Sequence, residues 1–70
     1  MIEYEHEERM KREEAAKRLH EIADSLARHN EVPFEREGLR YTVDVPAEVT
    51  LKVEIDVGAD KNEIEVEISW

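Results

Sequence analysis

The chain has 70 residues, of which 19 are acidic and 10 are basic, and it contains no cysteine. This length predicts one domain spanning 1–70, and the lack of cysteine excludes disulfides and thiolate metal sites. The net charge of -9 repels phosphate backbones and anionic lipids, so we expect neither nucleic acid nor a membrane as a partner.

The first ten residues, MIEYEHEERM, alternate apolar or aromatic side chains with glutamates. This period of two predicts a short, half-buried strand at the start of the chain. The same stretch lacks the basic and apolar regions of a signal peptide, and no later apolar run reaches the roughly 20 residues that span a membrane. We therefore expect a cytoplasmic protein.

The segment 12–29 is predicted to be a helix, because its apolar residues recur on one stripe. The stripe consists of Ala15, Ala16, Leu19, Ile22, Ala23, Leu26 and Ala27. Glu14 stands four residues before Arg18, which is the favourable orientation for an ion pair on a helix surface. Asn30 tolerates the left-handed backbone that commonly follows a helix, so we expect the helix to end there.

After the helix the apolar period returns to two, which predicts four strands. The dipeptide Glu37-Gly38 is a turn signal between the first two, because glycine readily adopts positive φ. A second reversal at 45–49 and a last loop at 58–62 separate the others. The apolar residues of the last two strands are Val49, Leu51, Val53, Ile55, Val57, Ile64, Val66, Ile68 and Trp70.

The element order β-α-β-β-β-β predicts an α+β fold. We expect a two-layer sandwich with one helix packed on a mostly antiparallel five-stranded sheet. Because Pro33 cannot donate to a ladder, its strand belongs at an edge, and the preferred sheet order is 2-3-4-5-1. The alternative order, 1-2-3-4-5, would place Pro33 inside the sheet. In the preferred order Trp70 lies on an inner strand and closes the core, so its removal should unfold the chain.

Three stretches together resemble the amphi-Trp domain family, small prokaryotic domains named for an amphipathic strand that ends in tryptophan. They are REEAAKRLHEIADSL, VDVPAEVTLKVEIDV and the C-terminal NEIEVEISW. Similar domains often have a serine cap before the REEA run, where Lys11 stands here, with Glu14 still able to reach back to the helix start. The resemblance implies an architecture and supplies no catalytic residues.

The side chains that usually carry chemistry do not converge in the sequence. His6 lies outside the predicted helix, and His20 and His29 fall on opposite flanks of its apolar stripe, so we interpret all three as solvent-facing or structural. The carboxylates of the last strand are spaced by about 6.6 to 7 Å, which is too wide for a tight chelate without a neighbouring strand. We expect no enzymatic activity, no cofactor and no metal.

Acidic residues from several predicted strands gather on the outer face of the sheet. They are Glu3, Glu5, Glu7, Glu35, Glu37, Asp44, Glu54, Asp56, Glu63, Glu65 and Glu67. The candidate partner-binding residues there are Glu54, Asp56, Glu63, Glu65 and Glu67. One interpretation is a solvated surface whose like charges keep sheets from stacking. The functional hypothesis is a non-enzymatic protein interaction module, an adaptor or small regulator that binds a basic protein through this acidic face or through an edge strand.

The alternative hypothesis is a homodimeric structural protein. One 18-residue helix covers a five-stranded sheet incompletely, so apolar residues would lie near solvent unless another protomer or a partner covers them. A metal-binding protein or an enzyme is the least supported class.

Overall fold

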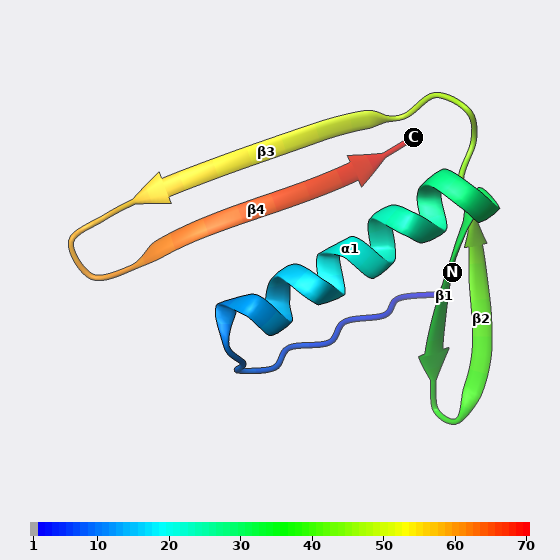
Figure 1. Cartoon of the computed structure of the whole chain (residues 1–70), viewed down its shortest axis with the longest axis horizontal. Helices are drawn as coiled ribbons and strands as arrows, with labels where there is room; N and C mark the ends of the chain where they lie inside the picture. Colours follow the sequence, from blue (N-terminus) through cyan, green and yellow to red (C-terminus); the bar gives the residue numbers. More distant parts are fainter. Residues whose placement is uncertain (1) are drawn as a thin grey trace.

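The computed structural model describes residues 2–70 and shows one helix and four strands (Figure 1). They are α1 (Arg12–His29), β1 (Glu31–Arg36), β2 (Leu39–Asp44), β3 (Thr50–Val57) and β4 (Asn62–Ser69). The strands form two separate antiparallel sheets of two strands each, β1–β2 and β3–β4. The α+β class is confirmed, whereas the single five-stranded sheet, in either order, is wrong.

The bounds of α1 agree with the apolar stripe, and its two ends differ. Asn30 has the left-handed backbone expected after the helix, with φ of 55°. At the other end Lys11 is extended, and its carbonyl oxygen accepts bonds from the N–H groups of Glu14 and Ala15 at 3.1 Å. Within the described residues no side chain caps this end: the Glu14 carboxylate lies 3.6 Å from Arg18 instead. The predicted ion pair is confirmed and the reach back of Glu14 is wrong.

The β1–β2 hairpin turns at the predicted dipeptide. Glu37 and Gly38 both have positive φ, 53° and 77°, the combination that a two-residue hairpin turn with the strands' own twist requires. In the resulting register Phe34 pairs with Tyr41. Both strands of a two-stranded sheet are edges, so Pro33 lies on an edge strand without any five-stranded sheet.

The N-terminal segment is not a strand, which corrects the first predicted element. Residues 2–11 have no regular secondary structure and run beside α1 (Figure 1). The ring of Tyr4 lies 5.4 Å from the ring of Phe34, and Phe34 lies 5.4 Å from Tyr41. The segment therefore forms no backbone ladder, and Tyr4 contacts β1 through its aromatic ring.

The connection between β2 and β3 leads away from the first hairpin. The N–H of Val45 donates to the carbonyl oxygen of Asn30 at 2.8 Å, which fixes the end of β2 next to the end of α1. Pro46 follows, with a fixed φ and no N–H to donate. The expected reversal that would have paired β3 with β2 is wrong, and β3 pairs with β4 alone.

The molecule has little core. Of the residues 2–70, none is fully buried, and α1 packs against β1 but makes no close backbone contact with β3–β4. The partly buried residues are Met10, Ala15, Ser25, Leu26, Glu31, Val32, Phe34, Tyr41, Val45 and Ile68. Trp70 is 61% exposed, so its predicted place in the core is wrong for the single chain. Trp70 is exposed because the β3–β4 hairpin, which leads to it, does not pack against α1.

Candidate interaction surface

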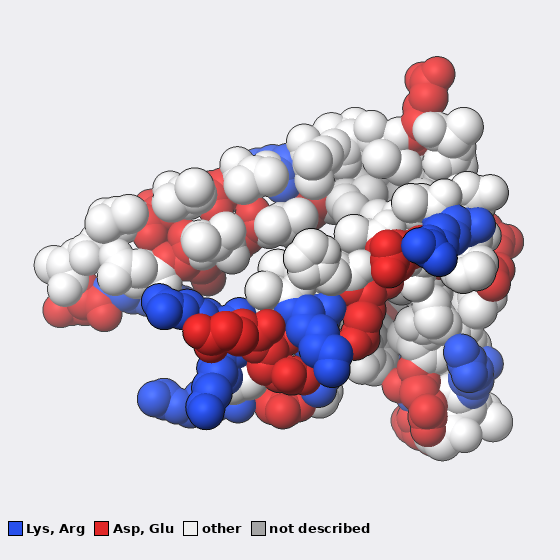
Figure 2. All heavy atoms as spheres, in the orientation of Figure 1, with Lys and Arg blue, Asp and Glu red and all other residues white. Residues whose placement is uncertain are grey.

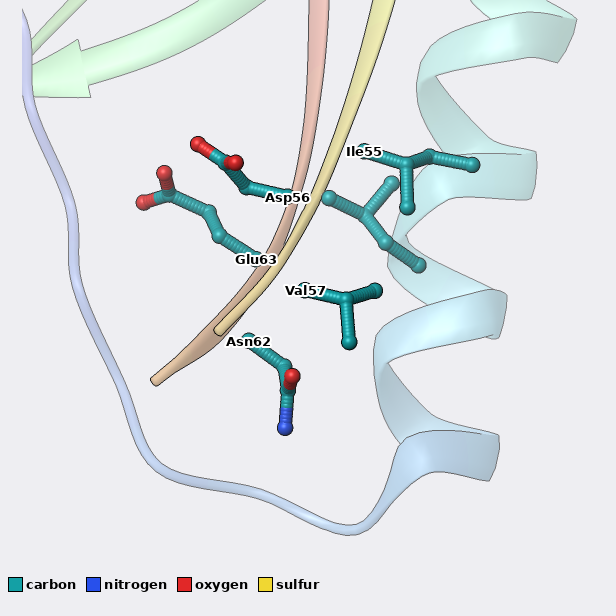
Figure 3. Close-up of a pocket in the computed structure, with 6 residues that line it drawn as sticks. Ile55, Asp56, Val57, Asn62 and Glu63 are labelled. Carbon is teal, nitrogen blue, oxygen red and sulfur yellow. The ribbon is translucent and has the colours of Figure 1, made fainter. Parts of the chain in front are cut away.

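The β3–β4 hairpin has two faces of opposite character. Its ladder pairs Val53 with Val66 and Ile55 with Ile64, so apolar side chains meet across the strands. Figure 3 shows Ile55 on one side of the hairpin while Asp56 and Glu63 point to the other. Because successive side chains of a strand alternate between faces, the register separates the apolar residues from the acidic ones.

The five predicted partner-binding residues all lie on the acidic face of this hairpin. Its cross-strand pairs are Lys52 with Glu67, Glu54 with Glu65, and Asp56 with Glu63. Two adjacent pairs therefore place carboxylates directly opposite each other, an arrangement that destabilises a sheet. Two lysines lie near these groups: Lys52 Nζ is 3.9 Å from Glu54 Oε2, and Lys61 Nζ is 3.7 Å from Glu63 Oε2.

The crowding of carboxylates changes the acidity of Glu65. Its pKa is raised above the usual 4.5, first by a hydrogen bond shared with the Glu63 carboxyl group. The negative charges of Glu63 and Glu54 add to this effect, because they disfavour another negative charge nearby. The negative charge of Glu65 is thus disfavoured by the carboxyl groups around it.

An open hollow lies at the end of the hairpin, beside the loop 58–61 (Figure 3). Its lining residues are Ile55, Asp56, Val57, Asn62, Glu63 and Ile64. Among residues 2–70, no group of three or more His, Asp or Glu side chains is arranged to hold a metal ion. The hollow therefore offers no ligand set that would suggest a cation.

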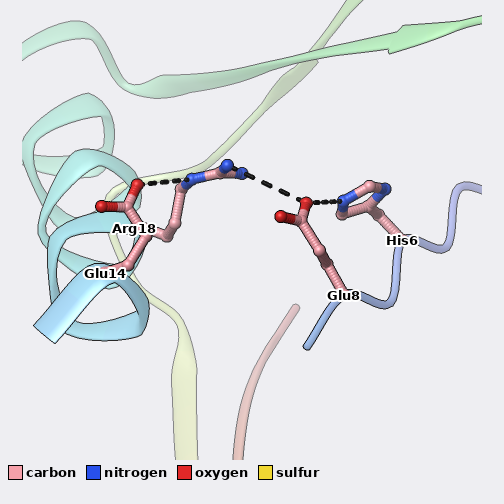
Figure 4. A network of polar contacts seen from close by, with 4 residues as sticks. All are labelled: His6, Glu8, Glu14 and Arg18. Atoms are coloured by element: carbon pink, nitrogen blue, oxygen red, sulfur yellow. Dashed lines mark hydrogen bonds and ion pairs between the residues drawn. The ribbon is translucent and has the colours of Figure 1, made fainter. Parts of the chain in front are cut away.

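The three histidines lie apart in the structure. His20 and His29 belong to α1, whereas His6 belongs to the N-terminal segment. His6 Nε2 lies 3.1 Å from Glu8, whose carboxylate is 4.0 Å from Arg18 on the helix (Figure 4). These exposed pairs connect the N-terminal segment with α1, and pairs of this kind contribute little stability.

The acidic sheet face predicted from the sequence is divided in the structure. Glu3, Glu5 and Glu7 lie in the irregular segment, and Glu35 belongs to the other sheet. Figure 2 shows acidic and basic side chains mixed over α1, while uncharged atoms cover the near side of β3–β4 with acidic atoms behind them. The concentrated acidic surface is therefore a property of β3–β4.

A comparison with known protein families covers the whole chain, including the β3–β4 hairpin. The family model described as the Amphi-Trp domain matches residues 1–70. The chain belongs to the Amphi-Trp domain family. No curated protein and no solved structure matches it. The family resemblance noted in the sequence is thereby confirmed.

The bare apolar face of this Amphi-Trp domain was not located by sequence reasoning. Val57 is 81% exposed and Ile64 is 72% exposed, although the alternation suggested that both face a core. The sequence contains one helix and many apolar strand residues. This imbalance indicates that some apolar strand residues lack a covering element, but it does not identify the strands. Within the described part of the chain, no helix is both long enough and apolar enough to span a lipid bilayer.

Proposed function

We propose that this Amphi-Trp domain is a non-enzymatic protein interaction module, an adaptor or small regulator. Its binding element is the β3–β4 hairpin, and its partner is a basic protein that meets the acidic face. The observation that carries the proposal is that five carboxylates lie on one face of a hairpin that has no close backbone contact with any other described helix or strand. This face is therefore accessible to a partner.

The electrostatics of the face support a basic partner. Like charges face each other at Glu54–Glu65 and at Asp56–Glu63. The pKa of Glu65 is raised first by its hydrogen bond with Glu63 and then by the repulsion among these carboxylates. Lysine or arginine side chains of a partner would relieve this repulsion, in addition to forming ion pairs of their own. A surface field of one sign also speeds the encounter with a partner of opposite charge.

The open edges of the hairpin favour a second mode of the same function. Strands β3 and β4 pair only with each other, so each leaves one row of backbone groups unpaired within the described chain. A partner strand could add to such an edge and form backbone hydrogen bonds. The acidic face would then select partners with basic side chains at alternate positions.

The chain offers a matched control for a binding experiment. Glu63, Glu65 and Glu67 occupy alternate positions of β4, and Glu3, Glu5 and Glu7 have the same spacing outside any strand. We would capture proteins from cell lysate with the native chain and with two variants. The β4 variant carries Gln at the three β4 positions, and the N-terminal variant carries Gln at the other three. Both variants lose the same charge.

The proposal predicts that the β4 variant loses partners that the N-terminal variant retains, and that added salt weakens their capture. Recovery of the same partners by both variants would show that the acidic face is only a solvated surface.

The runner-up function is that of a homodimeric structural protein, which the exposed apolar face favours.

A further inference from the structure

The apolar face of β3–β4 lacks the support that such a hairpin needs. Two antiparallel strands alone are marginally stable in water and usually require further strands or a helix against their apolar face. Here most of the face is exposed. Its residues are Leu51, Val53, Ile55, Val57, Ile64, Val66 and Ile68. With the single exception of Ile68, each of them is classed as exposed.

The surface area of the chain shows how much is left uncovered. A compact monomer of 8.3 kDa has an accessible surface of about 4,600 Å². This chain has 6882 Å², an excess of about 2,300 Å². Its radius of gyration is 14.0 Å, compared with about 11 Å for a compact domain of this length. The single chain is thus less compact, and exposes more surface, than a monomeric domain of its size.

We propose that a second copy of this chain covers the apolar face, with the β3–β4 hairpins of the two copies packed face to face around a two-fold axis. The excess of about 2,300 Å² per chain includes this apolar face, and obligate homodimers bury about 2,000 to 5,000 Å² in total over their two chains. Such interfaces are more apolar than transient ones. A two-fold interface requires a patch that complements itself, and a uniform apolar face does so.

The distribution of charge favours packing through the faces over pairing through the β4 edges. Each chain carries a net charge of -9, so two copies repel unless their acidic groups stay apart. Face-to-face packing holds both acidic faces on the outside, with about 10 Å between the sheets. Antiparallel pairing of β4 with its copy would instead set Glu63, Glu65 and Glu67 of the two chains beside one another, which is unfavourable.

This inference concerns the apolar face, whereas the proposed function concerns the acidic face, so each can fail without the other. The dimer is tested with the native chain by sedimentation velocity over a wide concentration range. We expect a species of twice the 8.3 kDa mass that dissociates on dilution. A monomer at all concentrations, whether open or closed onto its own helix, overturns the proposal, and so does a larger assembly.

Two substitutions in β3, one on each face, locate the interface. Val53→Glu places a charge on the apolar face, and Thr50→Glu places the same charge on the opposite face, where Thr50 pairs with Ser69. We expect loss of the dimer for Val53→Glu and its retention for Thr50→Glu. Far-ultraviolet circular dichroism checks that α1 persists, because α1 packs on β1 and not on this hairpin. A dimer that survives Val53→Glu overturns the proposed face.

Cross-linking keeps the proposal testable if Val53→Glu fails to fold. The chain has no cysteine, so one can be introduced at a chosen position. Val66→Cys lies on the apolar face, and Glu65→Cys is its neighbour on the acidic face. With a short bifunctional maleimide we expect covalent dimers from the first variant and chiefly monomers from the second. Equal cross-linking of both variants, or preferential linking through position 65, contradicts face-to-face packing.

Discussion

Glu54 and Glu65 lie directly opposite each other in the β3–β4 ladder, next to the like-charged pair of Asp56 and Glu63. Repulsion is therefore concentrated in the hairpin that has the fewest contacts with the rest of the molecule. The pairs Val53–Val66 and Ile55–Ile64 on the reverse side are apolar and exposed. Hence the charges on one face and the coverage of the other together determine how stable this hairpin is.

Replacing Glu65 with Gln should stabilise the chain. The substitution removes one of two directly opposed carboxylates while keeping the size and shape of the side chain. We expect a higher midpoint of thermal unfolding for Glu65→Gln at neutral pH and low salt, with a smaller gain at high salt because screening weakens the repulsion. Glu67→Gln is the control, since Glu67 lies opposite Lys52 in the ladder and its substitution relieves no directly opposed pair of like charges. An equal gain from both variants would contradict a local effect of Glu54.

Stability should rise as the pH falls from neutral toward 4.5. The pKa of Glu65 is raised in the folded chain, so the folded state retains a proton that the unfolded state has released. Stability therefore increases as the pH falls through the folded pKa of Glu65, and this contribution is lost as the pH rises through it. Below the usual value of 4.5 both states are protonated and the gain levels off. Urea midpoints across this window should slope in the native chain and slope less in Glu65→Gln; identical slopes would reject the assignment to Glu65.

Gly38→Ala should destabilise the β1–β2 hairpin through backbone strain alone. Gly38 has φ of 77°, and an added methyl group would meet nothing within 4 Å. The left-handed conformation costs a residue with a Cβ atom about 1 to 2 kcal/mol, so the free energy of unfolding should fall by about that amount. Gly38→Asn should lose less, because asparagine tolerates this region. Urea denaturation of the two variants measures the difference, and no loss for Gly38→Ala would show that the turn can change its conformation.

Phe34→Ala should remove the main aromatic contact of the first hairpin. The ring of Phe34 contacts both Tyr4 and Tyr41, and each aromatic pair contributes about 0.5 to 1.5 kcal/mol beyond the burial of surface. We expect a loss of about 2 kcal/mol, less than for a fully buried ring, because Phe34 is only partly buried. Urea denaturation measures the loss, and the near-ultraviolet circular dichroism of the tyrosines should weaken. Leu39→Ala, at a position 61% exposed, is the control.

The local elements could be predicted from the sequence, but their assembly could not. The stripe from Ala15 to Ala27 gives the helix its bounds, and Gly38 fixes the first turn, because both effects depend on neighbours along the chain. The placement of β3 depends on contacts with distant segments. An apolar alternation indicates that a face will be covered without indicating what covers it, and Trp70 was assigned to a core for that reason.

The candidate site could likewise be predicted only in its local features. The register of β3–β4 follows from its short loop and strict alternation, so the five acidic residues could be assigned to one face. Glu3 and Glu35 were added to that face only because a continuous sheet was assumed. The rise in the pKa of Glu65 depends on which carboxylates lie across the ladder, and alternation within a single strand does not reveal those partners.

The opposed character of the two faces of β3–β4 has a consequence for avidity. If two copies join through their apolar faces, their acidic faces point in opposite directions, and the assembly gains two equivalent docking positions. A basic partner with two suitable segments, or an array of such partners, would then be held far more tightly than by one position alone. Dissociation of the dimer would weaken the binding of such a partner, although every carboxylate of the acidic face would be unchanged.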